Sequence, residues 1–235
     1  DILQEHCRCD APWLRGKPAG PIPAEAAAAL VRIYRMDRQS LEAAPGLKVI
    51  AKHGVGLDNI DIEAATQHQV AVLWTPQANA DAVAQHTLAL MLALANRVKA
   101  ADAALRQGHF ERRMDFSSLE LNGRVLGIIG LGRIGGRVAQ RAAAGLGFEI
   151  LAYDPYIEAS ADHTPARLVK SLDELLSRAD FVSLHVPLTD ETRHIINDKS
   201  LAHMQAGSYL VNTSRGAAVD EAALARALTT GHLAG

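Results

Sequence analysis

Short apolar segments alternate along the 235-residue chain with segments whose apolar residues recur at helical spacing. The short apolar segments predict strands at residues 30–34, 47–51, 70–74, 125–129, 149–153, 181–185 and 208–212. The helical spacing predicts helices at residues 40–44, 62–68, 134–144, 172–177, 198–203 and 221–230. Strands that alternate with helices indicate an α/β protein with mostly parallel sheets, covered by helices on both faces.

One longer helix stands apart from this alternation. Asn79 is a good N-cap for it, Asp81 lies in its first turn, and it is predicted to run to about Lys99. It is apolar on most of its faces, which is typical of a helix buried between two bodies. We therefore expect two doubly wound parallel-sheet domains, residues 1–96 and 97–235, with this helix at the seam.

The ends of both predicted domains are irregular. Residues 2–6 show helical spacing, and Cys7 and Cys9 alternate like a short strand. An alanine-rich helix predicted at residues 24–29 runs into the next strand without a turn residue. A doubly wound sheet would also continue with a strand after the helix at 221–230. We expect both domains to lack elements at the chain ends, and residues to be missing near Ala29.

Composition and charge narrow the function classes. Hydrophobic residues make up 49% of the chain and charged residues 21%, which is the balance of a globular protein. A net charge of −2 argues against a nucleic-acid-binding polycation. The longest apolar run, residues 88–95, is too short to span a bilayer, and no signal-peptide pattern opens the chain. A single C-x-C pair favours neither a zinc site nor a disulfide framework. We expect a reduced, cytoplasmic protein without nucleic-acid, membrane or metal partners.

A glycine-rich loop carries the clearest chemical signal. The strand at 125–129 leads into Gly130, Gly132 and Gly135 in the spacing G-x-G-x-x-G, and a helix follows. The first glycine permits a tight turn, the second lets a pyrophosphate approach the backbone, and the third lets helix and strand pack closely. The helix N-terminus supplies N–H groups and positive potential for phosphates. The alternative is a glycine-rich turn that binds no ligand.

An acidic residue completes the dinucleotide pattern. Asp154 ends the next strand, close to the spacing of about 20 residues at which an acid accepts hydrogen bonds from the adenosine ribose. A carboxylate at this place repels a 2′-phosphate, so the pattern favours NAD over NADP as the cofactor.

Six longer motifs then carry a family resemblance. They are VIAKHGVGLDNID (49–61), TPQANADAVAQHTLALML (75–92), ELNGRVLGIIGLGRIG (120–135), AYDP (152–155), SLHVPLTDETRHIIN (183–197) and LVNTSRGAAVDE (210–221). With them the chain resembles the NAD-dependent D-2-hydroxyacid dehydrogenases, most of all the D-3-phosphoglycerate dehydrogenase type. The resemblance implies a flavodoxin-like substrate domain and a Rossmann NAD domain, with the active site in the cleft between them. It also implies hydride transfer between the nicotinamide and a 2-hydroxy or 2-keto acid.

The resemblance assigns the catalytic arginine to Arg215. A guanidinium grips a carboxylate and polarises the adjacent carbonyl without the risk of deprotonation. The alternative is a solvated loop arginine. For the cofactor, the resemblance adds contacts at Arg133, Ile134, Val186, Pro187, Thr213 and Thr87.

Substrate contacts follow from the same resemblance. The backbone N–H groups of Val55 and Gly56 form an anion nest for the substrate carboxylate. Arg32, Lys52 and Arg112 match basic positions of the phosphoglycerate type, and several cations suit a dianionic phosphate. The alternatives are a glycine-rich turn and ordinary solvated surface charges.

The family's chemistry also needs an acid/base histidine and a glutamate that orients it, and the resemblance places both beyond residue 235. His53, His86 and His185 are weak substitutes, so we expect residues 1–235 alone to be inactive. A homodimer formed through the NAD domain is expected. A formate- or phosphite-type dehydrogenase, or an NAD-sensing corepressor on the same fold, remains an alternative.

Overall fold

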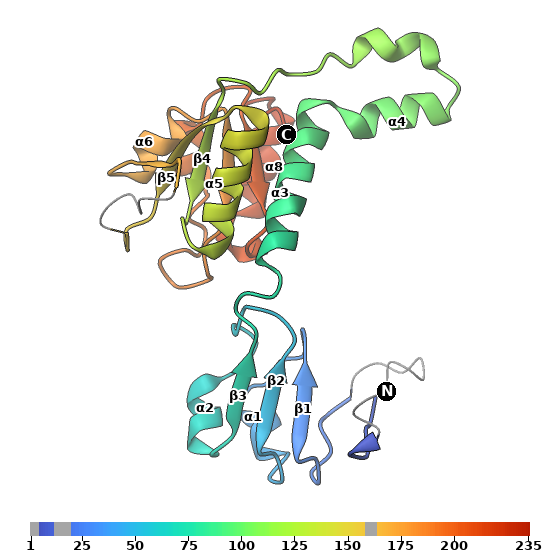
Figure 1. Cartoon of the computed structure of the whole chain (residues 1–235), viewed down its shortest axis with the longest axis vertical. Coiled ribbons are helices and arrows are strands. Elements are labelled where there is room, and N and C mark those ends of the chain that lie inside the picture. Colours follow the sequence, from blue (N-terminus) through green and yellow to red (C-terminus); the bar gives the residue numbers. More distant parts are fainter. Residues whose placement is uncertain (1–4, 12–19, 158–163) are drawn as a thin grey trace. The chain divides into compact units, whose positions relative to one another are not determined.

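The computed structural model describes residues 5–11, 20–157 and 164–235. It divides into two compact units, unit 1 (Asp1–Ala78) and unit 2 (Asn79–Gly235), shown in Figure 1. This division differs from the predicted boundary after residue 96, because the long helix packs within unit 2.

Unit 1 is a three-stranded parallel sheet in the order β1-β2-β3. Its elements are β1 (Ala28–Val31), α1 (Arg38–Glu42), β2 (Val49–Lys52), α2 (Ile62–Gln67) and β3 (Ala71–Trp74). The side chains of Asp37 and Asp61 cap the two helices. Consecutive right-handed crossovers place both helices on the same face of the sheet. On the strands, Leu30 and Leu73 remain exposed, so helices on both faces are not seen in the described part of this unit.

The N-terminal predictions of unit 1 need correction. Residues 24–29 do not form a helix, because Ala28 and Ala29 pair with Val49 and Ile50 of β2. Parallel strand pairing thus overrides the helix propensity of alanine. Cys7 and Cys9 form no strand, and part of the helix predicted at 2–6 lies outside the described residues.

Unit 2 is a five-stranded parallel sheet in the order β6-β5-β4-β7-β8, the strand arrangement of a Rossmann domain. Its strands are β4 (Val125–Ile129), β5 (Glu149–Tyr153), β6 (Arg167–Leu168), β7 (Phe181–Leu184) and β8 (Tyr209–Asn212). Its helices are α3 (Ala80–Ala95), α4 (Val98–Arg106), η3 (Phe110–Asp115), α5 (Arg133–Leu146), α6 (Leu172–Leu176), α7 (Asp198–His203), η4 (Gly216–Ala218) and α8 (Glu221–Thr229). The predicted parallel α/β class is confirmed, although the short strand β6 was not predicted.

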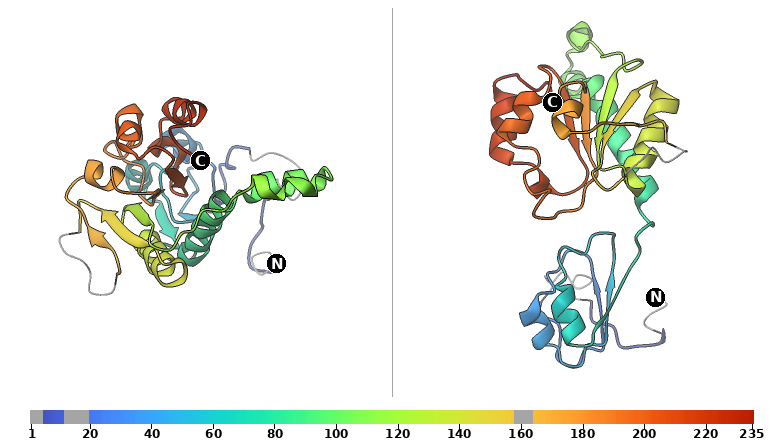
Figure 2. Two further views of the ribbon diagram at one scale, coloured as in Figure 1. Left: turned by 90° about the horizontal axis from the view of Figure 1, so that it is seen from above. Right: turned by 90° about the vertical axis from the view of Figure 1, so that its left-hand side faces the viewer.

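Helices cover both faces of this sheet (Figure 2). On one face α3 and α5 enclose a core that contains Met91, Val138 and Phe181. On the other face α6, α7 and α8 enclose a second core that contains Leu175 and Leu201. Each face buries an apolar stripe of its helices, which is the main stabilising term for such a layered domain.

The long helix is shorter than predicted. It ends at Ala95, and Arg97 adopts a left-handed backbone conformation with φ 51° before α4 begins. Helix α4 and η3 then extend away from the sheet as an arm (Figure 1). At its N-terminus, α3 is tied to α5, because Asp81 accepts hydrogen bonds from Arg137 and Arg141. Asn79 is the N-cap residue of α3, as predicted, but its side chain makes no cap hydrogen bond.

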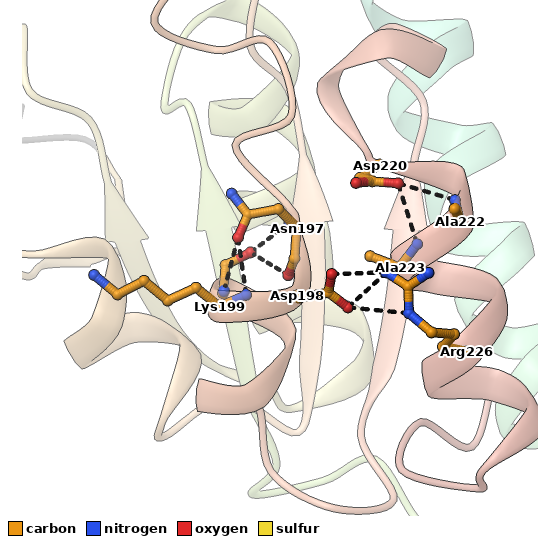
Figure 3. A network of polar contacts seen from close by, with 8 residues as sticks. Asn197, Asp198, Lys199, Asp220, Ala222, Ala223 and Arg226 are labelled. Carbon is orange, nitrogen blue, oxygen red and sulfur yellow. Dashed lines mark hydrogen bonds and ion pairs between the residues drawn. The ribbon is translucent and has the colours of Figure 1, made fainter.

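A polar network joins α7 to α8 (Figure 3). The Asn197 side chain accepts from the backbone N–H groups that open α7, and Asp220 does the same for α8. The Arg226 guanidinium then lies 2.7 Å from the Asp198 carboxylate. Both side chains of this ion pair are exposed, so the caps and not the ion pair define the helix starts.

The last residues of the chain lie beside β8. The N–H of Ala234 donates to the Ser208 carbonyl at 2.9 Å, and the N–H of Leu210 donates to the Gly235 carbonyl at 3.0 Å. No further strand follows α8 among the described residues, but Leu233 forms an isolated parallel bridge with Ser208. Among the described residues, no helix is both long enough and apolar enough to cross a membrane.

The packing of α5 on β4 yields a test. A Cβ at Gly135 would lie 2.1 Å from the Gly130 carbonyl oxygen, whereas a Cβ at Gly136 meets nothing closer than 4.0 Å. We expect Gly135→Ala to lower the free energy of unfolding by about 2 kcal/mol or more, because the helix must shift. Gly136→Ala should be neutral or stabilise by about 0.5 kcal/mol. Urea unfolding of both variants measures this, and equal stabilities would contradict the packing argument.

Candidate functional site

The carboxyl ends of four neighbouring strands meet at one edge of the unit 2 sheet. Because all strands are parallel, the residues that follow β4, β5, β7 and β8 come together there. These residues include Gly130, Asp154, Val186 and Thr213, which the sequence analysis placed in the dinucleotide site.

The turn after β4 is held close to β7. Gly130 has φ +90°, a conformation that L side chains rarely adopt, and a Cβ there would lie 2.8 Å from the His185 carbonyl oxygen. The Val186 side chain lies at 3.0 Å from the same position. A glycine is therefore required for both the backbone conformation and the strand approach.

Neither backbone conformation nor protein packing requires a glycine at Gly132. Its φ of −72° and ψ of −156° suit any residue, and a Cβ there would meet no protein atom within 4 Å. Gly132 is the N-cap residue of α5, which has no side-chain cap and no acidic residue in its first turn. The first N–H groups of this helix, those of Arg133, Ile134 and Gly135, thus face open space with the positive end of the helix dipole. This arrangement fits a bound phosphate or pyrophosphate.

The Asp154 carboxylate is fixed beside this loop. Its Oδ2 accepts from the Leu131 N–H at 2.9 Å, and its Oδ1 accepts from the Tyr156 N–H at 3.0 Å. The carboxylate is half-buried and keeps further lone pairs for donors such as ribose hydroxyls.

The sequence analysis missed a side-chain contact near this acid. The Tyr156 hydroxyl donates to Glu191 Oε2 at 2.7 Å, which links the segment after β5 to the segment after β7. The adjacent Glu191 carboxylate raises the pKa of Tyr156. Only the tertiary structure brings these two exposed residues together.

Thr87 does not face the sheet edge. Its side chain is fully buried, and its hydroxyl lies 2.9 Å from the Val83 carbonyl and 2.9 Å from Thr213 Oγ1. The predicted direct cofactor contact of Thr87 is therefore corrected to a contact with Thr213. Thr213 itself is half-buried, as is Val186, whereas Pro187 is exposed.

The loop that carries Arg215 is ordered by Asn212. The Asn212 amide oxygen accepts from the Ser214 N–H at 2.9 Å, and its amide nitrogen donates to the Arg215 carbonyl at 2.8 Å. The half-buried Arg215 donates through Nη1 to the Ser214 carbonyl at 2.9 Å. An asparagine at the end of a strand, two residues before a serine, is the pattern of an Asx turn. This pattern in the sequence could have indicated the role of Asn212.

The basic residues expected to bind phosphate occupy different environments. The Lys52 ammonium donates to the Arg32 carbonyl and to Asn59 Oδ1, so it ties two loops of unit 1 together. The Arg112 guanidinium lies on the arm of unit 2, 3.0 Å from Asp115. Arg32 lies just after β1 with an exposed side chain.

The predicted anion nest lies after β2. Gly54 adopts φ +137°, and the half-buried Val55 and Gly56 follow it. The backbone conformation at Gly54 favours glycine.

Three histidines were weighed as proton donors. His53 and His86 are exposed. The His185 ring accepts or donates at Nε2 to Ser183 Oγ at 2.9 Å, and its buried Nδ1 has no hydrogen-bond partner among the described residues. Burial lowers the pKa of His185 to about 4, so this ring stays neutral near pH 7 and does not store a proton for catalysis. The described residues contain no group of three or more His, Cys, Asp or Glu side chains placed to hold a metal ion.

Sequence comparisons match this architecture. Residues 88–235 match the family model "D-isomer specific 2-hydroxyacid dehydrogenase, NAD binding domain". The chain is 47% identical over 226 residues to a D-3-phosphoglycerate dehydrogenase of Mycobacterium bovis, covering 93% of this chain and 41% of that protein. It is 46% identical over 191 residues to a hydroxypyruvate reductase of Thermotoga maritima, covering 81% of this chain and 61% of that protein. The chain thus spans less than two thirds of either relative.

Solved structures show the same fold. A D-lactate dehydrogenase of Aquifex aeolicus, complexed with NAD and lactic acid, superposes with a TM-score of 0.83 at 36% identity, covering 91% of this chain and 64% of that one. An NAD-dependent formate dehydrogenase of Staphylococcus aureus, in complex with NAD, gives a TM-score of 0.81 at 33% identity, with the same coverage of 91% and 64%. The resemblance drawn from the motifs and the prediction of NAD as cofactor are both confirmed.

Desolvation of the His185 ring predicts a pH dependence of stability. Its pKa is about 4 in the folded chain and 6.5 in the unfolded chain, so between these values only the unfolded chain binds the proton. We expect the free energy of unfolding to fall as the pH drops from 6.5 to 4, by up to about 3 kcal/mol from this residue.

The measurement is urea unfolding across that pH range. His185→Gln should flatten the dependence, while the matched control His68→Gln, at an exposed position, should leave it unchanged. An unaltered slope in His185→Gln would show that folding does not lower the pKa of His185.

Proposed function

The chain belongs to the D-isomer-specific 2-hydroxyacid dehydrogenase family, and from this premise we propose that the whole protein transfers a hydride between NAD(H) and C2 of a 2-hydroxy or 2-keto acid. The observation that carries the proposal is the open space over the N-terminus of α5 at Gly132, with the Asp154 carboxylate beside it.

The residues at this edge fit the dinucleotide. The N–H groups of Arg133, Ile134 and Gly135 would bind its pyrophosphate, since α5 has no side-chain cap. The Asp154 carboxylate would accept from the adenosine ribose hydroxyls and repel a 2′-phosphate, which supports NAD over NADP. Val186 and Pro187 would line the path of the bound cofactor between β4 and β7. When bound, NAD supplies the hydride acceptor at C4 of its nicotinamide ring.

Arg215 is the proposed catalytic residue. A guanidinium presents a planar fork of N–H donors that matches a carboxylate. In this role it would hold the substrate carboxylate and polarise the neighbouring carbonyl, stabilising negative charge that develops on the oxygen. Asn212 supports it by fixing the backbone of the loop at Ser214 and Arg215. The proton would come from a residue outside residues 1–235.

Residues of unit 1 would bind the substrate's anionic groups. We assign the carboxylate to the N–H groups of Val55 and Gly56. A phosphorylated, dianionic substrate is supported by the exposed Arg32, whereas Lys52 and Arg112 already have partners in Asn59 and Asp115. Arg32 is therefore the strongest candidate for phosphate recognition.

The oligomeric state and compartment are part of the proposal. We infer a cytoplasmic homodimer formed through the NAD domain, as the family resemblance implies. The arm of α4 and η3 supports a second copy as its partner, because Leu105, Phe110 and Met114 on it are each at least 60% exposed.

Gly132→Ala tests the cofactor site. We expect it to weaken NADH binding at least tenfold, about 1.4 kcal/mol, because the new methyl group enters the space that the pyrophosphate would occupy. The free energy of unfolding should change by less than about 1 kcal/mol, since the backbone at Gly132 suits alanine. Calorimetric titration with NADH measures the affinity, with Gly136→Ala as the matched control. Unchanged affinity in Gly132→Ala would place the dinucleotide elsewhere.

Arg32→Ala tests the substrate class in the whole protein. For 3-phosphoglycerate we expect kcat/KM to fall at least about tenfold more than for D-lactate, because only the former carries a second, dianionic group. Arg35→Ala, which removes a nearby exposed arginine, is the matched control. Glycerate, 2-hydroxyglutarate and formate complete the panel. If the monoanionic acids are preferred and Arg32→Ala leaves their ranking unchanged, the phosphate site is refuted.

A further inference from the structure

Two threonine hydroxyls meet behind the carboxyl end of β8. Thr87 Oγ1 on α3 lies 2.9 Å from Thr213 Oγ1, and it also lies 2.9 Å from the Val83 carbonyl oxygen one turn earlier in α3. Thr87 is the single polar residue among the buried residues of this helix, the others being Ala80, Ala84, Met91 and Ala95. Its own helix already satisfies its hydroxyl, so packing alone does not require the contact with Thr213.

The direction of these hydrogen bonds follows from counting protons. A hydroxyl has one proton to donate, and the Val83 carbonyl oxygen has none. Two oxygens 2.9 Å apart without a proton between them repel, so the Thr87 hydroxyl donates to Val83. The bond between the threonines then needs the proton of Thr213, which donates to Thr87 Oγ1. The Thr213 oxygen is left with lone pairs only.

Thr213 is half-buried and follows β8, two residues before Arg215. Asp154 follows β5, on the other side of β4, and takes the adenosine ribose in the proposed function. The nicotinamide half of the dinucleotide would therefore extend toward β7 and β8. The Thr213 hydroxyl oxygen, as a hydrogen-bond acceptor, would contact the nicotinamide half of the dinucleotide.

We propose that Thr87 is a positioning residue that fixes the Thr213 hydroxyl as a hydrogen-bond acceptor, so that the site selects a donor group on the nicotinamide nucleoside. The inference rests on the proposed NAD site. Two donors of this half fit the same chemistry, the carboxamide NH₂ group and a ribose hydroxyl group.

The experiment compares dissociation constants of three reduced dinucleotides measured by calorimetry. These are NADH, its 3-acetylpyridine analogue, which has a methyl group in place of the carboxamide NH₂, and an analogue with a 2′-deoxy nicotinamide ribose. We expect the protein to bind one of the two analogues about fivefold more weakly than NADH, the worth of one hydrogen bond. The analogue that is disfavoured identifies the donor.

Variants of Thr87 then separate positioning from packing. Thr87→Ser keeps the hydroxyl and should retain the fivefold preference. Thr87→Val removes the hydroxyl at nearly constant volume, which frees the Thr213 proton to turn outward, so the preference should fall below about twofold. Thr87→Ala removes the same hydroxyl group and leaves a smaller side chain, and its preference for NADH over the disfavoured analogue should also fall below about twofold. The affinity ratio is informative because a purely structural defect weakens NADH and its analogues equally.

The outcomes distinguish the two proposals. The positioning role of Thr87 would be overturned if Thr87→Val and Thr87→Ala both kept the ratio of analogue to NADH dissociation constants that the unmodified protein shows. It would also be overturned if the unmodified protein bound NADH and both analogues equally well. Failure of the unmodified protein to bind NADH at all would refute the dinucleotide site itself.

Discussion

The close contact between the start of α5 and the end of β4 is the constraint on which the rest of unit 2 depends. The absence of a side chain at Gly135 lets the helix approach the carbonyl of Gly130, and Gly130 in turn lets β4 lie against the end of β7. This contact directs the N-terminus of α5 toward the edge where the strands end. It also places the Leu131 N–H within reach of the Asp154 carboxylate, so the phosphate-binding and ribose-binding groups are positioned by one packing interaction.

Two polar pairs lie at the carboxyl-terminal part of the sheet, near the ends of β7 and β8. They are Ser183 with His185 and Thr87 with Thr213. Buried hydroxyl and imidazole groups are tolerated when they pair with each other, and their hydrogen bonds then have a fixed direction. Desolvation keeps the His185 ring neutral, and the Val83 carbonyl fixes the direction of the Thr87 hydroxyl.

The basic residues that the sequence singles out differ in what holds them in place. Lys52 and Arg112 are basic residues in a suggestive sequence context, yet each is held by a neighbouring oxygen. Arg215 lies on the loop after β8, where it donates to the Ser214 carbonyl and where Asn212 fixes the backbone.

The sequence by itself determined the segment from β4 through the glycine loop and α5 to Asp154, together with the parallel α/β class of both units. These features depend on contacts between residues near each other in the chain, on strand periodicity and on backbone conformations that favour glycine. Each of them can be recognised from a short stretch of sequence. The tertiary structure decided what depends on distant partners. Residues 24–29 do not form a helix because Ala28 and Ala29 pair with β2, and Thr87 is buried because α3 packs on α5 and β8. Lys52 likewise donates to acceptors on two other loops of unit 1. The role of a side chain depends on which groups folding places within about 3 Å of it, and the spacing of residues along the chain does not reveal which groups these are.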